Sequence, residues 1–352
     1  MTVLRCLLCL FVLTCPEFAI CAQTVVITFD VPGSLGTFPE SINKNGDVAG
    51  YYLDTSLQHR GFLRRVNGVL TTFDVPGSLS TDPVSIGVEG QITGSYEDTV
   101  TVHGFLRQPD GSITTFDGTD STETHPRAIS ASGLITGYFF DAIGVHGFLR
   151  ERNGTMTPFD VPGTFPITYP QAINRAGQIT GFSFDQPGVS GRGFVRERDG
   201  SFSRPFDSQT YPVAINADGR VTGYFGDNTR SGFVSQPDGA EVFFDVVTPP
   251  LLSVPVAIDH SGRVAGWYYN INTNCVCGFL RKQDGSFITF SATSTASETI
   301  PTTMYGSFIA GNYSDDDGRH GFIRDSANIS AFRCNGKTSA SRECGCEMNL
   351  CE

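Results

Sequence analysis

Charged side chains are scarce in this sequence, at 17% of 352 residues, and the chain has a single Trp. Hydrophobic residues nevertheless make up 39% of it, so the composition differs from that of a disordered chain, which combines low hydrophobicity with high charge. A basic block is also missing, because 24 Lys and Arg stand against 36 Asp and Glu, for a net charge of −12. This acidic balance argues against nucleic acids and anionic membranes as partners.

Long apolar runs are missing too, and a membrane-spanning helix would need one of about 18 residues. The apolar stretch Cys6–Thr14 is shorter, and it follows a positive charge and precedes a cleavage-like site at Ala22. A lipid anchor on Cys21 is the alternative, which Ile20 disfavours because a small residue is required there. We therefore expect residues 1–22 to be a secretory signal peptide. The mature chain should be soluble and secreted, with a periplasmic or cell-surface location as alternatives.

Six cysteines remain after the predicted leader, and four of them lie in the C-terminal segment 334–352. An even number of cysteines in an exported protein predicts disulfides. The tail could instead hold a metal, but it has no His and no paired C-x-x-C spacing, so disulfides are favoured. The candidates are Cys275, Cys277, Cys334, Cys344, Cys346 and Cys351.

Helical periodicity is absent over any useful length, and a different pattern repeats about every 43 residues instead. Each repeat holds four short β-branched and aromatic segments bounded by turn residues. In order, they are an Ile-Asn segment, a Gly-aromatic segment, a Gly-Phe segment and a Phe-Asp segment, as in Ile173-Asn174, Gly137-Tyr138, Gly147-Phe148 and Phe159-Asp160. We name these predicted strands A, B, C and D, and their Asn-x-x-Gly and Asp-Gly connections predict hairpin turns.

Four strands in about 43 residues, repeated seven times, predict an all-β fold: a single seven-bladed β-propeller over residues 23–333, followed by a Cys-rich tail. A β-solenoid would favour shorter periods. Strand D occurs once more than the others, at Val25–Asp30 and again at Asn328–Phe332, and the sequence leaves open which copy closes the ring. The D–A loops, such as Val31–Pro39, and B–C loops of about eight residues should share one face, where binding is expected.

An acidic residue stands four positions after the Gly of most B strands, and blade seven adds a denser run that includes Asp315 and Asp316. Such carboxylates could bind calcium, but a feature of nearly every blade more simply caps its loop. We expect no cofactor, with calcium as the open alternative. A recurring His before Gly-Phe (His103, His146 and His320) could bind zinc, but structural hydrogen bonding is favoured because separate blades hold these residues apart. No catalytic motif is present.

Blade six carries the single Trp, Trp267, followed by Tyr268 and Tyr269. Aromatic faces near a loop can stack on sugars, so these residues, with Asp315 and Asp316, are the candidate ligand-binding set. Packing within the core or between blades is the competing interpretation.

Three motifs resemble the HAF-type extracellular repeat family of bacteria: T-F-D-V-P-G at Thr28–Gly33, A-I-N-x-x-G-x-I-T-G at Ala172–Gly181 and H-G-F-L-R at His146–Arg150. The resemblance covers residues 24–332 and implies bacterial export and a repeat fold. It brings no assigned activity and no functional residues. Met304-Tyr305-Gly306 departs from the Ile-Asn pattern in blade seven.

The sequence thus predicts an extracellular binding or scaffold module, monomeric and without assigned catalysis, that takes a glycan, peptide or protein on its loop face. A secreted hydrolase or lyase with a site at the mouth of the propeller channel is one alternative. A purely structural surface or matrix protein is the other.

Overall fold

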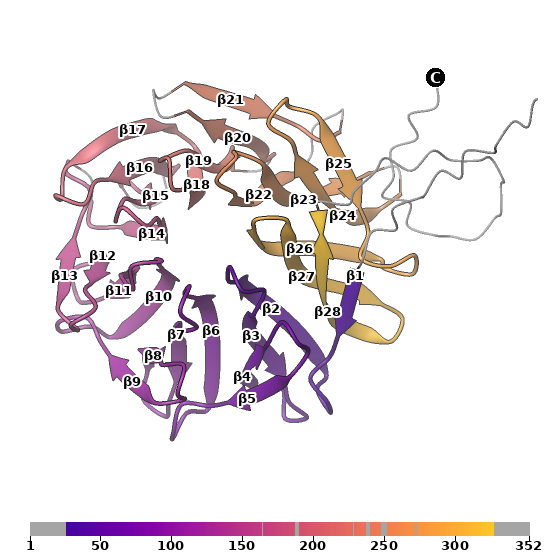
Figure 1. The fold of residues 1–352 in the computed structure, drawn as a ribbon. Coiled ribbons are helices and arrows are strands. Elements are labelled where there is room, and N and C mark those ends of the chain that lie inside the picture. Colours follow the sequence, from indigo (N-terminus) through magenta and orange to yellow (C-terminus); the bar gives the residue numbers. More distant parts are fainter. Residues whose placement is uncertain are drawn as a thin grey trace, which may run out of the picture.

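The computed structural model describes residues 26–163, 165–186, 190–227, 229–236, 240–247, 252–271 and 273–326, with only the backbone of residues 204 and 205. All the regular elements named in these ranges are β-strands, as predicted. These ranges contain no helix that is long and apolar enough to cross a membrane. Figure 1 shows the strands arranged as small sheets around one axis, the architecture of a β-propeller. The predicted leader (1–22) and Cys-rich tail (334–352) lie outside the described residues.

Antiparallel pairing groups the strands into four-stranded units in chain order. The first three units are β2 (Gly36–Ile42), β3 (Val48–Leu53), β4 (His59–Arg64), β5 (Leu70–Phe73); β6 (Ser80–Ile86), β7 (Ile92–Glu97), β8 (Val102–Arg107), β9 (Ile113–Phe116); and β10 (Glu123–Ile129), β11 (Ile135–Phe140), β12 (Val145–Arg150), β13 (Met156–Phe159). The next three are β14 (Thr168–Ile173), β15 (Ile179–Ser183), β16 (Arg192–Arg196), β17 (Phe202–Ser208); β18 (Thr210–Ile215), β19 (Val221–Phe225), β20 (Ser231–Ser235), β21 (Glu241–Phe244); and β22 (Ser253–Ile258), β23 (Val264–Asn270), β24 (Cys275–Arg281), β25 (Phe287–Phe290). The last comprises β26 (Glu298–Tyr305), β27 (Phe308–Asp315) and β28 (Gly318–Asp325). The first strand of each unit lies nearest the axis (Figure 1).

The last unit takes its outer strand from the beginning of the chain. β1 (Val26–Phe29) pairs antiparallel with β28, from Val26 opposite Arg324 to Phe29 opposite Gly321. Figure 1 shows the indigo strand beside the yellow one. The N-terminal copy of strand D therefore covers the edge of β28, which would otherwise offer unpaired backbone groups. The competing copy, Asn328–Phe332, lies outside the described residues.

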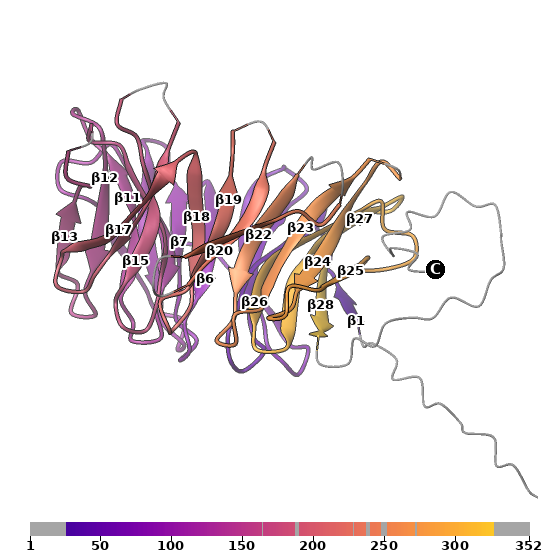
Figure 2. The ribbon, with the colours of Figure 1, turned by 90° about the horizontal axis from the view of Figure 1, so that it is seen from above.

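The predicted loop lengths need correction. β2 begins at Gly36, so the loop expected over Val31–Pro39 ends earlier. The connections between second and third strands are mostly shorter than eight residues, because the ladder continues outward to pairs such as Leu53 and His59. The segment Met304-Tyr305-Gly306, where the Ile-Asn pattern fails, still makes the turn between the first and second strands, as a tight hairpin in which Tyr305 pairs with Phe308. The predicted grouping of the loops agrees with the order of the strands: the second-to-third and fourth-to-first connections lie on one face of the ring, which we call the loop face (Figure 2). We call the opposite face, with the first-to-second and third-to-fourth connections, the turn face.

The repeated glycines are required by close contacts. A Cβ on Gly50 would lie 2.0 Å from the carbonyl oxygen of Phe38, and one on Gly61 would lie 2.9 Å from the Phe73 ring. The first contact arises where β2 bulges between Pro39 and Ser41. Backbone approach therefore explains the Gly-aromatic motif, and ring packing explains the Gly-Phe motif.

Neighbouring units are joined by an Arg of the third strand that lies over a Phe of the preceding unit. Arg64 Cζ lies 4.9 Å from the centroid of the Phe29 ring, and Arg107, Arg150, Arg196, Arg281 and Arg324 repeat the contact. Four of these arginines are buried, and Arg281 and Arg324 are half-buried. At a desolvated site a cation–π contact contributes up to about 2 kcal/mol. The turn face adds hydrogen bonds, because Asn174 Nδ2 donates to the Asn216 carbonyl of the next unit at 3.0 Å.

Candidate functional site

Around the axis, on the loop-face half, one pair of positions carries different side chains from unit to unit. Each first strand carries a residue just before a shared proline, and its partner on the second strand follows the shared Gly, as Phe38 pairs with Tyr51 across Pro39 and Gly50. The residues before the proline are Phe38, Asp82, His125, Tyr169, Tyr211, Val254 and Ile300. Backbone pairing is the same in each unit while the chemistry changes, so the fold does not dictate these side chains.

Aromatic rings run continuously through three of these units. His125 stacks on Tyr138 with centroids 5.1 Å apart, and Tyr138 meets Tyr169 of the next unit edge to face at 4.9 Å. The series continues through Phe182 to Tyr211 at 5.2 Å, and Tyr211 stacks on Tyr224 at 5.0 Å. We call these six residues the aromatic arc. At the end of the arc, the cationic side chain of Arg230 lies over the Tyr224 ring, with Cζ 4.6 Å from the ring centroid.

Polar side chains accompany the arc. His125 Nε2 lies 2.9 Å from Glu123 Oε2, and Arg127 Nη2 donates to Gln171 Oε1 at 3.2 Å. Arg127 and Gln171 occupy the position after the shared proline in neighbouring units. The arc therefore presents ring faces and edges together with fixed hydrogen-bonding groups.

The first two units, next to the unit where the arc begins, hold a second cluster, which we call the Glu40 cluster. It consists of Phe38, Glu40, Tyr51, His59 and Asp82. The Tyr51 ring stacks between Phe38, at 4.7 Å, and His59, at 4.3 Å. His59 Nδ1 lies 2.5 Å from Asp82 Oδ1, which joins the two units. This arrangement combines an aromatic stack with carboxyl and imidazole groups.

Glu40 is the bulged residue of β2, between Pro39 and Ser41. Burial raises the pKa of its carboxyl to about 7; Arg127 opposes this rise and Asp82 adds to it. Burial, with the nearby Glu40 and Asp82, also raises the pKa of Tyr51 to about 12. A carboxyl that is half-protonated near neutral pH can donate or accept a proton, which marks it as a functional candidate.

The loop tips around this region expose aliphatic side chains. Leu57, Val100 and Ile143 stand on the second-to-third strand loops of three consecutive units, and their exposed fractions are 67%, 83% and 70%. Leu35 and Leu79, on the intervening fourth-to-first strand loops, are exposed as well. Exposed apolar side chains gathered on one face of a protein can mark an interaction site.

The recurring histidines form brackets at the rim of the loop face. His146 Nδ1 lies 2.9 Å from Asp160, and its Nε2 lies 3.1 Å from Asp141. Asp141 Oδ1 also accepts hydrogen bonds from the backbone N–H groups of Ile143 and Gly144. His103 and His320 repeat this geometry. Structural hydrogen bonding and loop capping are therefore the observed roles. No cluster suited to a metal ion occurs among the described residues.

The predicted ligand-binding set does not come together as one site. Trp267 pairs with Val254 in the same axial layer as the arc, whereas Tyr268 is fully buried in a core cluster and is not available to a ligand. The Tyr269 hydroxyl donates to Asn274 Oδ1. Asp315 pairs with His320 and caps the backbone N–H of Asp317, and Asp316 is exposed in the same loop.

Two of the disulfide candidates are described. Cys275 and Cys277 are buried in β24, and both are disulfide-bonded. Cys334, Cys344, Cys346 and Cys351 lie outside the described residues.

The Glu40 cluster and the arc were missed from the sequence. The signal that could have found them is the position flanking the repeated proline, which varies while everything around it repeats.

Comparison with solved structures supports the fold. A streptogramin B lyase structure matches with a TM-score of 0.56 and 15% identity, covering 85% of this chain and 97% of the lyase. Virginiamycin B lyase from Staphylococcus aureus gives a TM-score of 0.58 at 12% identity, over 86% and 99% of the two chains. The β-propeller domain of the trilobed protease from Pyrococcus furiosus gives 0.62 at 9% identity, over 84% and 95%.

These likenesses confirm the predicted β-propeller fold and, at such low identity, nothing further. No protein-family model matches the sequence, and the comparison with curated proteins found no match. The likeness to HAF-type repeats therefore remains a resemblance of motifs.

Proposed function

We propose that the chain is an exported, monomeric, seven-bladed propeller that acts as an extracellular binding module, with its ligand on the loop face. In this proposal residues 1–22 are the signal peptide, residues 23–333 form the ring, and the tail 334–352 is stabilised by disulfides. Its ligand is a glycan, peptide or protein. The supporting observation is that the aromatic arc and the exposed aliphatic loop tips share the loop face.

A glycan suits the arc best among these ligand classes. Sugar rings have an apolar face that stacks on aromatic side chains, and their hydroxyls need hydrogen-bonding partners. Rings such as Tyr138 and Tyr169 stand beside Glu123, Arg127 and Gln171, which supply donors and acceptors. The exposed aliphatic loop tips then form an apolar border of this site.

The test is a glycan array, with a peptide and protein screen in parallel, on the exported chain. We expect retained ligands to be lost with Tyr169→Ala and unaffected by Tyr305→Ala, an exposed tyrosine on the turn face. In a second pair, Val100→Asp on the loop face should weaken binding of a protein ligand, whereas Val66→Asp on the turn face should not. Equal loss from loop-face and turn-face variants would contradict the proposal.

One observation favours a second function, acid–base catalysis at the Glu40 cluster by a hydrolase or lyase. Glu40 has a pKa near neutrality and lies in the electrostatic field of Arg127 and Asp82. A turnover screen would reveal activity that depends on a group titrating near pH 7. Glu40→Gln should abolish that activity while leaving ligand retention intact. Retained turnover in Glu40→Gln would exclude this role for Glu40.

A further inference from the structure

The fourth unit lacks a large side chain that its counterparts have. The second residue after the shared Gly of each second strand is Tyr52, Tyr96, Phe139, Ser183, Phe225, Tyr268 or Tyr313, in chain order. The strand pairing shows that Tyr52 and Ser183 are equivalent. Tyr52 pairs with Arg60 and Ser183 pairs with Arg192, and each arginine stands just before the Gly-Phe motif of its unit. A serine thus stands where other units carry an aromatic ring.

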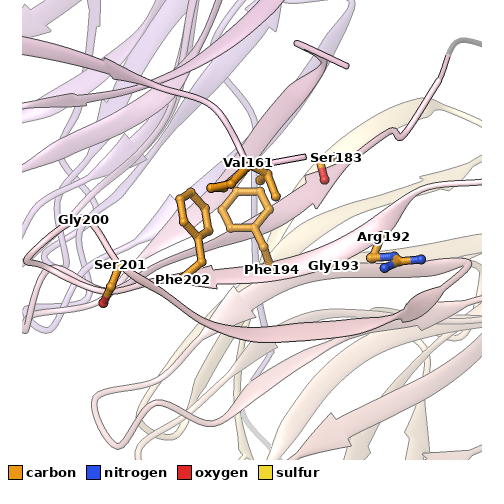
Figure 3. Close-up of a pocket in the computed structure, with 9 residues that line it drawn as sticks. Val161, Ser183, Arg192, Gly193, Phe194, Gly200, Ser201 and Phe202 are labelled. Carbon is orange, nitrogen blue, oxygen red and sulfur yellow. The ribbon is translucent and has the colours of Figure 1, made fainter. Parts of the chain in front are cut away.

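A cavity lies at this place. It has a volume of about 470 Å³ and is lined by Val161, Pro162, Ser183, Arg192, Phe194 and Phe202, among others. In the first unit, the equivalents of Val161 and Phe194 are Val31 and Phe62, and Tyr52 packs against their cluster. The cavity therefore includes the space that a tyrosine ring occupies in the first unit. Figure 3 shows the rings of Phe194 and Phe202 beside Val161, with Ser183 and Arg192 on the other side.

One buried polar group in this cavity, the Ser183 hydroxyl, has no partner among the residues that the structure describes. Ser183 is 1% exposed, and its Oγ makes no hydrogen bond among the described residues, although buried hydroxyls are normally satisfied. In four other units the tyrosine hydroxyl at this position bonds to a threonine of the outer strand: Thr72, Thr115, Thr289 and Thr28. The counterpart of that threonine in the fourth unit is Pro205, which has no hydroxyl.

We propose that this cavity binds one phenolic ring from solution, separately from the site on the loop face. The ring would lie between Val161 and Phe194, in the space that tyrosine fills elsewhere, but in the reverse orientation. Ser183 stands where the tyrosine side chain begins, so the hydroxyl of the bound ring would point back toward Ser183 Oγ and bond to it. The cavity is larger than one such ring, and Arg192 at its edge is exposed. Substituted phenols should therefore bind with their substituents directed toward Arg192.

The test uses p-cresol, which is the tyrosine side chain itself, with the exported chain and calorimetry or NMR titration. We expect saturable binding of p-cresol, and binding of toluene weaker by about fivefold because it cannot hydrogen-bond to Ser183. Ser183→Ala should weaken p-cresol binding by a similar factor and leave toluene binding unchanged. Equal affinity for p-cresol and toluene would overturn the role of the hydroxyl.

Ser183→Tyr supplies the missing ring covalently. It should abolish p-cresol binding and raise the thermal midpoint, because it fills a cavity. If that variant does not fold, Val161→Phe narrows the cavity from the opposite wall and should also abolish binding. Tyr169→Ala, which alters the arc, should leave p-cresol binding intact, so the two proposals fail independently. Undiminished binding in Ser183→Tyr or Val161→Phe, or no binding to the unmodified protein, would overturn the proposal.

Discussion

The imidazole of His320 lies 2.9 Å from the carboxylate of Asp30, from Nδ1 to Oδ2, although 290 residues separate them in the chain. His320 belongs to β28, and Asp30 follows β1, so this contact joins the two ends of the ring beyond their backbone pairing. Internal units make the same bracket locally, as His146 does with Asp160. Ring closure therefore reuses a side-chain contact that the repeat already encodes.

Closure should depend on pH through this contact. Burial alone would lower the pKa of His320, but hydrogen bonds and charge from Asp30 and Asp315 outweigh it, and the pKa is raised above 6.5. The folded state then binds the proton more tightly, so the stabilisation is full below pH 6.5 and is lost as the pH rises through the folded pKa. Asp30→Asn should cost about 0.5–1 kcal/mol at pH 5.5 and less at pH 8.5, given the exposure of Asp30.

Urea unfolding at the two pH values measures this difference. Asp74→Asn is the control, since its partner is Arg60, which stays charged at both values. A loss of stability from Asp30→Asn that does not change with pH would argue against protonated His320 as the cause.

Removing the Phe29 ring should destabilise the closed ring more than removing the charge of Asp30. Phe29 meets Phe62 edge to face at 6.0 Å and lies under Arg64 at 4.9 Å, so it joins the last unit to the first. Phe29→Ala should lower the free energy of unfolding by about 2–4 kcal/mol. Phe308→Ala, at an exposed ring on the turn face, should cost less than about 1 kcal/mol. Chemical unfolding compares them, and similar losses would contradict a closing role for Phe29.

Glycine at position 50 should tolerate no side chain. A Cβ there would lie 2.0 Å from the Phe38 carbonyl oxygen, so Gly50→Ala should cost about 3 kcal/mol or more and displace Phe38 from its stack on Tyr51. Gly77→Ala meets no atom within 4 Å and is strained only by its φ of +85°, so it should cost about 1 kcal/mol. Thermal unfolding ranks the two variants, and near-ultraviolet circular dichroism reports the tyrosine stack.

Glu40 should destabilise the fold as it ionises. Burial raises the pKa of this carboxyl from 4.5 to about 7, so the folded state holds the proton more tightly, and the associated stability is lost as the pH rises from about 4.5 to 7. Glu40→Gln should therefore raise the free energy of unfolding by about 2 kcal/mol at pH 8 and change it little at pH 4. Carboxyl NMR titration would measure the pKa directly, and a value near 4.5 would refute this account.

Most of the fold could be predicted from the repeat of about 43 residues. Strand identity was predictable because each segment is short, β-branched or aromatic, and bounded by turn residues, and the Asn, Gly and His-Asp motifs recur for local reasons that the structure bears out. Loop lengths were predicted too long, because hairpin ladders extend through residues such as Leu53 and His59, whose side chains carry no strand signal.

By itself, the sequence determined the all-β class, the repeat and the glycines and capping residues that each unit needs, since these depend on contacts within about 43 residues. Tertiary structure alone decided which strand pairs with β28 and that Glu40 and Arg127, 87 positions apart, share one electrostatic field. It also decided that the space missing a ring at Ser183 stays open. The physical reason is that ring closure places equivalent positions of successive units around one axis. Side chains that differ from unit to unit are then close enough to form one site.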